Sequence, residues 1–176
     1  MYSYTPASKN KKALILTFLL FFCAAICLFA GQNLPYRGVW QFIGLGCLVL
    51  AIQITSRYLL TAFRYSLSPL DGLDEANDFT VERIQGNHTK VVANVSLYTH
   101  VALLPRQPMA ELDKKVGKIG RLFNFCPTLF PDGAWVYVFE FNGEQHALLF
   151  EPDDEFLRQL RLRIEVKDVG EEEGAR

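Results

Sequence analysis

The apolar residues are concentrated in two long blocks near the N-terminus, and after them the pattern changes to short alternating runs. The first block, 13–30, carries no charge and is long enough as a helix to cross most of a hydrocarbon core about 30 Å thick. The second block, 39–58, has one charged residue, Arg57, near its end, where a long side chain reaches the headgroups. We therefore predict two transmembrane helices over these ranges.

The segment 31–38 between the blocks contains Gly, Asn and Pro, which end helices, and it is short enough to force the two helices to run antiparallel. Tyr36 and Trp40 fall where an interfacial aromatic belt is expected. The alternative is a cleaved signal peptide, but the first block exceeds the usual apolar length of about 7–15 residues and a second block follows directly.

The orientation of the hairpin follows from its basic residues. Lys9, Lys11 and Lys12 precede the first helix, and Arg57 and Arg64 lie at or after the end of the second. The connecting loop has a single Arg37. Under the positive-inside rule, both termini of a two-span protein in the cell (plasma) membrane are then cytoplasmic, and residues 1–12 form a cytoplasmic N-terminal segment.

From residue 59 to 166 the alternation of apolar and polar positions predicts a small, mainly β domain. Gly86-Asn87 and Asn142-Gly143 are hairpin turn sequences. The ranges 95–104 and 109–120 stay open, the first as a strand or a bent connection and the second as a short helix or a loop. The predicted strands are 63–68, 79–85, 88–94, 121–126, 134–141 and 144–151, with 95–104 as the seventh.

An amphipathic helix is predicted at 153–165, capped by Asp153, with Phe156, Leu157, Leu160 and Ile164 as its buried stripe. Residues 167–176 lack an apolar face and are expected to form a disordered acidic tail. The strand 134–141 places four aromatic residues on one face. Core packing is favoured over a base-stacking platform for this row, because the domain lacks a basic groove.

Charge divides the chain in the same way as the hydrophobic pattern. No Asp or Glu precedes Asp71, whereas residues 65–176 carry twelve basic and nineteen acidic side chains. An excess of negative charge is a poor match for nucleic acid, so no nucleic-acid partner is expected. The basic cluster of the domain is Lys114, Lys115, Lys118 and Arg121, which we predict as a contact for a membrane surface or a partner, against the simpler interpretation of a solvated face.

Candidate chemistry is sparse. Cys23, Cys27 and Cys47 lie within the predicted helices; a soft metal site is the alternative to packing, but it needs thiolates and usually a fourth ligand. His88, His100 and His146 fall on separate strands without nearby cysteines, so no metal or other cofactor is expected. No nucleophile with a recognisable base partner occurs, and the chain is not expected to be an enzyme.

The order of elements resembles a bacterial membrane-anchored pleckstrin-homology-like protein. The resemblance rests on the two-helix hairpin, on FRYSL at 63–67, on DFTVER at 78–83, and on a final strand pair followed by EPDDEFL at 151–157. It implies about seven antiparallel strands in a partly open barrel closed by the C-terminal helix, and a domain that binds rather than catalyses. Lipid-binding relatives hold phosphoinositides with basic residues in the loop that is 68–78 here; this loop has four acidic residues and no basic one, so phosphoinositide binding is not expected.

Two functions follow from these observations. The first is an interaction module that presents its cytoplasmic β domain to a protein partner at the inner membrane face, through a strand edge or the groove beside the last helix. The second is an integral subunit of a transport or envelope-assembly complex, whose hairpin packs with other spans through the small residues Gly44, Gly46 and Ala51.

Overall fold

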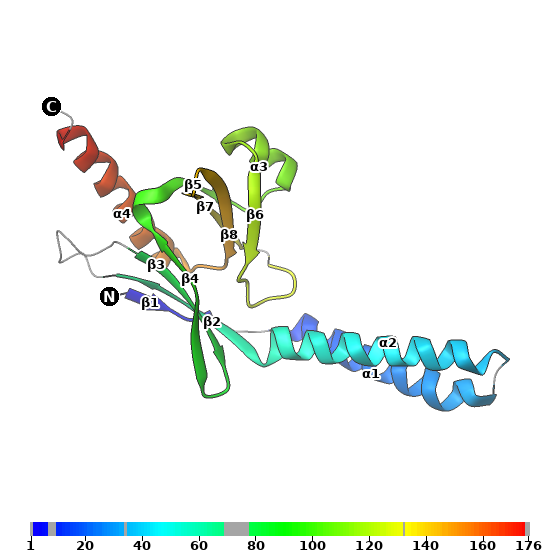
Figure 1. Cartoon of the computed structure of the whole chain (residues 1–176). Coiled ribbons are helices and arrows are strands. Elements are labelled where there is room, and N and C mark those ends of the chain that lie inside the picture. Colours follow the sequence, from blue (N-terminus) through cyan, green and yellow to red (C-terminus); the bar gives the residue numbers. More distant parts are fainter. Residues whose placement is uncertain (1, 7–9, 34, 69–77, 132, 175–176) are drawn as a thin grey trace. The chain divides into compact units, whose positions relative to one another are not determined.

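The computed structural model describes residues 2–6, 10–33, 35–68, 78–131 and 133–174, the side chains of Gln32 and of 166–174 excepted. It contains two long apolar helices near the N-terminus, then a mainly β region of two four-stranded sheets, and a C-terminal helix (Figure 1). The chain divides into two compact units, the helical hairpin and the β domain.

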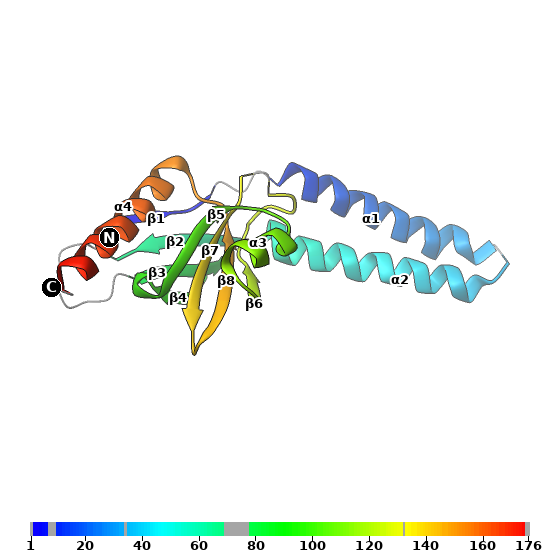
Figure 2. The ribbon, with the colours of Figure 1, turned by 90° about the horizontal axis from the view of Figure 1, so that it is seen from above.

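The hairpin consists of α1 (Lys11–Phe29), a short 3-10 turn η1 (Ala30–Asn33) and α2 (Arg37–Ile54), which continues as the π-helical turn η2 (Thr55–Leu59). Figure 2 shows α1 and α2 side by side along their length. Both helices are long and apolar enough to span a membrane. Large apolar side chains lie at the surface of both helices, such as Phe22 (70% exposed) and Phe42 (78% exposed).

Small residues bring the two helices together. A Cβ added at Gly44 would lie 2.9 Å from Leu28 Cγ and 3.1 Å from Cys27 Cβ, whereas one added at Gly46 meets nothing within 4 Å. Ala51 is fully buried. Two of the three predicted small residues therefore serve contact within the hairpin, and Gly46 does not.

Polar and sulfur contacts also join the hairpin. The Asn10 side-chain amide donates a hydrogen bond of 2.6 Å to the Tyr58 carbonyl, which links the start of the first helix to the end of the second. The Sγ atoms of Cys23 and Cys47 lie 4.0 Å apart, which is a contact of free thiols and not a disulfide.

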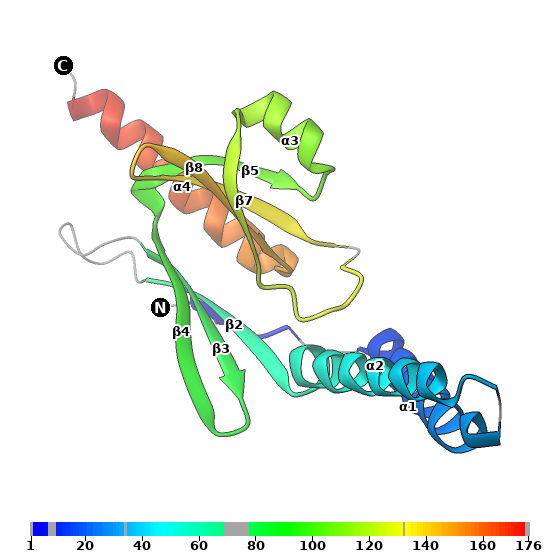
Figure 3. The same cartoon turned by 45° about the vertical axis from the view of Figure 1, so that its right-hand side comes forward.

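The first sheet has the order β1 (Tyr2–Tyr4), β2 (Thr61–Leu67), β3 (Asp78–Gln85) and β4 (His88–Ser96). Strand β1 pairs antiparallel with β2, so the N-terminal segment joins the β domain although the whole hairpin separates the two strands in sequence. The pattern of apolar and polar positions did not predict this strand. Figure 3 shows β3 and β4 as a long hairpin that extends beyond the other strands of this sheet.

The second sheet has the order β5 (His100–Pro105), β7 (Trp135–Phe141), β8 (Glu144–Phe150) and β6 (Ile119–Asn124). The expectation of an entirely antiparallel domain is wrong here, because β6 pairs with β8 in parallel. The reason is topological: β6 runs opposite to β7 and lies beyond β8, and β8 is already antiparallel to β7 through their hairpin.

Both predicted hairpin turns are present. Gln85 pairs with His88 across Gly86-Asn87, and Phe141 pairs with Glu144 across Asn142-Gly143. Asn142 and Gly143 both take positive φ (54° and 79°), which is what the tightest two-residue turns require. The open range 95–104 contains both a bend and a strand, because β4 ends at Ser96, the 3-10 turn Leu97–Thr99 follows, and β5 begins at His100.

The second sheet carries a buried cluster on each face. Its inner face, which includes Tyr137, Phe139, Leu148 and Phe150, packs against the first sheet and the C-terminal helix. Its outer face is covered by α3 (Met109–Val116), whose Leu112 contacts a second cluster with Val136, Val138 and Leu149. The open range 109–120 therefore resolves into a short helix, which ends at Gly117 with φ 91°, followed by the start of β6.

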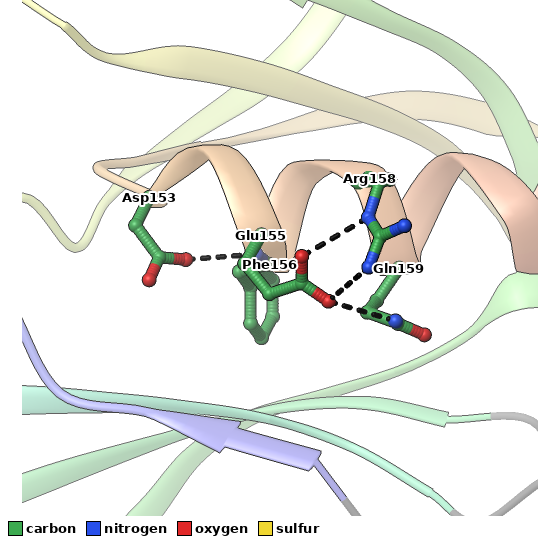
Figure 4. Close-up of polar contacts among 5 residues, drawn as sticks. All are labelled: Asp153, Glu155, Phe156, Arg158 and Gln159. Atoms are coloured by element: carbon green, nitrogen blue, oxygen red, sulfur yellow. Dashed lines mark hydrogen bonds and ion pairs between the residues drawn. The ribbon is translucent and has the colours of Figure 1, made fainter.

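The C-terminal helix α4 (Asp154–Gly174) is capped by Asp153, as predicted. The Asp153 carboxylate accepts a hydrogen bond of 2.8 Å from the Phe156 N–H, and the Glu155 carboxylate accepts from Arg158 and Gln159 (Figure 4). Phe156, Leu160 and Ile164 are buried, and Leu157 is half-buried. The helix continues beyond the predicted end at 165 and covers most of the predicted tail.

Candidate binding groove

An apolar groove of about 340 Å³ lies in the β domain, between β4 of the first sheet and strands β6, β7 and β8 of the second. This volume falls at the lower end of the range of ligand pockets. One wall is formed by four consecutive residues of β4, from Val92 to Val95, and we refer to the whole feature as the β4 groove. Its floor is Arg121 and Phe123 of β6, Phe139 and Phe141 of β7, and His146 and Leu148 of β8.

The floor is formed by side chains on the inner face of the second sheet. They continue the alternating row of buried side chains beyond the area that the first sheet covers. On β7 the burial falls along this row: Tyr137 is fully buried, Phe139 is 8% exposed and Phe141 is 59% exposed. The aromatic row predicted as core is therefore core at Tyr137 and Phe139, and exposed groove surface at Phe141.

Two β-bulges shape the groove. On β4, Ala93 pairs with Val81 and Val91 pairs with Glu82, so Val92 is an extra residue that turns toward the groove. On β6, Ile119 pairs with Gln145 and Arg121 with His146, so Gly120 is extra. As a result Ile119 belongs to the cluster on the outer face, whereas Arg121 lines the groove on the inner face.

The groove has positive rather than negative character. Arg121 and His146 are the ionisable side chains among its lining residues, and none of the lining residues is acidic. The Arg121 guanidinium lies 5.5 Å from the centre of the Phe123 ring. The His146 ring lies 5.8–6.3 Å from the rings of Phe123, Phe139 and Phe141, and its Nδ1 is buried without a hydrogen-bond partner among the described residues.

Strand β4 is the last strand of its sheet. Within the described part of the chain, it has β3 on one side and no strand on the other, so its outer backbone groups border the groove. Four of its nine residues line the groove consecutively: the bulge places Val92 beside Ala93, and Asn94 belongs to the lining although its side chain is hydrogen-bonded to Thr80 and Asp78 of β3. The strand edge itself is therefore part of the wall.

The predicted basic cluster does not form one patch. Lys114 and Lys115 lie exposed on α3, which covers the outer face of the second sheet, and Lys118 lies exposed in the connection to β6. The Lys115 Nζ donates to Gln107 Oε1 at 2.7 Å. Arg121 lines the groove on the opposite face. The structure therefore separates Arg121 from the two helical lysines.

A second hollow, of about 630 Å³, lies at the end of β5 and the start of β7. The Arg106 guanidinium donates to the Pro131 carbonyl at 3.1 Å there, and Arg161 stacks over Trp135 at 4.9 Å from its ring centre. The lining is Pro105, Arg106, Gln107, Pro108, Pro131, Gly133, Ala134 and Trp135. Its basic and aromatic groups are thus already engaged in contacts within the chain.

Among the described residues, no group of three or more His, Cys, Asp or Glu side chains is arranged to hold a metal ion. The acidic loop that argued against phosphoinositide binding falls at 69–77, outside the described residues. The groove residues that sequence reasoning missed are Val92, Phe141 and His146. The position of Phe141 beside a hairpin turn was the available signal.

Searches against protein-family models, curated proteins and solved structures gave no significant match to this chain.

Proposed function

We propose that this chain is a membrane-anchored interaction module, in which the helical hairpin crosses the membrane and a pleckstrin-homology-like β domain binds a protein at the cytoplasmic face. The observation that carries the proposal is the β4 groove, an apolar surface beside the outer edge of β4. Within the part of the chain that the structure describes, no strand pairs with this edge. Such edges are a recurring means of protein recognition, because their backbone groups need partners.

Membrane insertion is supported by the outward-facing aromatic and aliphatic side chains of α1 and α2. The pairing of β1 with β2 supports a two-span arrangement, since strands before and after the hairpin belong to one sheet. Both chain segments then lie on the same side of any membrane that the hairpin crosses. The distribution of basic residues favours the cytoplasm as that side.

The alternative is an integral subunit that assembles through the hairpin. Gly46 supports it, because the space over its α-carbon is open and a second helix can approach closely there. The preferred function rests instead on a surface of the β domain.

Site-specific photocrosslinking in native membranes separates the two. A photoreactive amino acid replaces either Phe141 in the groove or Phe42 on the hairpin, both of them exposed positions. Protein adducts at 141 support recruitment by the β domain, and adducts confined to 42 support assembly through the hairpin. Proteolysis of residues 64–176 by a protease added outside intact cells would contradict the cytoplasmic orientation.

A further inference from the structure

The β4 groove combines three features that together specify the chemistry of an occupant. It offers a strand edge, an aromatic floor and a positive charge, all within the β domain. Resting on the proposed function, we infer that the groove binds an extended peptide segment of a partner protein, which pairs with β4, packs a large apolar side chain against the aromatic floor, and directs a carboxylate toward Arg121.

The strand edge favours a peptide over a small amphiphile. From Val92 to Val95, β4 lines the groove beside the floor, and among the described residues no strand pairs with its outer edge. An extended chain satisfies such an edge with main-chain hydrogen bonds, and its alternate side chains point to one face. A lipid chain leaves those backbone groups without partners.

The floor determines which side chain fits. The rings of Phe123, Phe139 and Phe141 lie within 6.3 Å of the His146 ring centre, and all four residues line the groove of about 340 Å³. Aromatic walls of this kind favour an aromatic or large aliphatic guest, which gains both burial and ring contacts. Phe141, 59% exposed, loses most of its exposure when such a group enters.

The charge of the groove predicts an acidic side chain on the bound peptide. Arg121 is exposed at the groove and lies over Phe123, and no acidic residue belongs to the lining. A carboxylate one or two positions from the apolar anchor lies within reach of the guanidinium, where a charge-assisted hydrogen bond forms.

The test is a selection from a random decapeptide library on the full-length protein in lipid nanodiscs, with counter-selection on the Phe141→Lys variant. We expect enriched sequences with a large apolar residue next to Asp or Glu. The affinity of an enriched peptide, measured by fluorescence anisotropy, is expected to fall about tenfold or more in Arg121→Glu and to recover when the acid of the peptide is replaced by Lys. Lys114→Glu is the matched control and should leave the affinity unchanged.

Strand pairing has its own readout. N-methylation of single peptide bonds should weaken binding at every second position, because alternate N–H groups of a paired strand face the β4 edge. No enrichment over the counter-selection, an Arg121→Glu variant with unchanged affinity, or an N-methyl scan without this period would overturn the inference. Binding of dodecanoate would also overturn it if the Arg121→Glu variant weakened that binding as much as it is expected to weaken binding of the peptide.

Failure of this inference is distinguishable from failure of the proposed function. Protein adducts at position 141 without any peptide binding mean that a folded surface, not an extended segment, occupies the groove. The absence of both means that the groove is not a protein-binding site.

Discussion

The hydroxyl group of Tyr65 should stabilise the β domain through hydrogen bonds that connect its two sheets. Tyr65 is fully buried in β2. Its hydroxyl donates to the Phe125 carbonyl at 2.9 Å and accepts from the Glu151 N–H at 3.3 Å, so it joins the first sheet to the ends of β6 and β8. Replacement by Phe keeps the ring contacts with Phe79 and Phe150 and removes only this link.

Tyr137 provides a matched control. It is also fully buried, but its hydroxyl has no hydrogen-bond partner among the described residues. Leaving a buried carbonyl or N–H unpaired costs about 1–3 kcal/mol, so Tyr65→Phe should lower the free energy of unfolding by about that amount. Tyr137→Phe removes an unsatisfied polar group from the core and should be close to neutral or slightly stabilising.

The assay is urea unfolding of the full chain in detergent micelles, followed by the fluorescence of Trp135 in a Trp40→Phe background. The slope of unfolding free energy against urea should stay the same, since the surface exposed on unfolding does not change. Equal losses of stability in the two variants would refute the reasoning, because they would mean that the hydroxyl contacts do not distinguish the two tyrosines.

Three further predictions address the hairpin, the last helix and alkaline stability. Gly44→Leu should weaken the packing of α1 against α2 by about 1–3 kcal/mol and lower the melting temperature in detergent, whereas Gly46→Leu should not; equal effects would argue against the close approach at Gly44. Asp153→Ala should cost about 0.5–2 kcal/mol in urea unfolding through loss of the helix cap, with the neighbouring Asp154→Ala nearly neutral, and a reversed order would contradict the capping contact. Burial raises the pKa values of Tyr65 and Tyr137 above the ordinary value near 10, so their protonated forms support stability below that pH, and each group should cost up to about 1.4 kcal/mol per pH unit above it. Unfolding free energies at pH 9–11 should therefore fall less steeply in Tyr137→Phe than in the parent chain, and identical slopes would count against the shift.

The hairpin and most strands were predictable because their signals are local. Uncharged blocks identify α1 and α2, and period-two runs with Gly-containing turns identify β3, β4, β7 and β8. The strand β1 was missed because three residues carry little pattern and its pairing with β2 spans the whole hairpin. The parallel pairing of β6 was missed because strand adjacency is not encoded in the periodicity of a single strand.

The groove was less accessible to sequence reasoning. Arg121 was grouped with three nearby lysines, and the extra residue Gly120 turns it to the other face of the sheet. Phe141 continued the alternation of a core strand, and only the limited extent of the covering sheet leaves it exposed. Bulges and the edges of covering layers depend on long-range packing, which a single strand does not record.

The central claim is that the β4 groove binds a protein, and crosslinking at two exposed positions of the β domain tests it most directly. A photoreactive amino acid is placed at Phe141 in the groove or at Tyr98, 58% exposed on the turn between β4 and β5. We predict a discrete protein adduct in native membranes at 141 and none of the same mass at 98. The same adduct at both positions, or an adduct at 98 alone, would contradict the account.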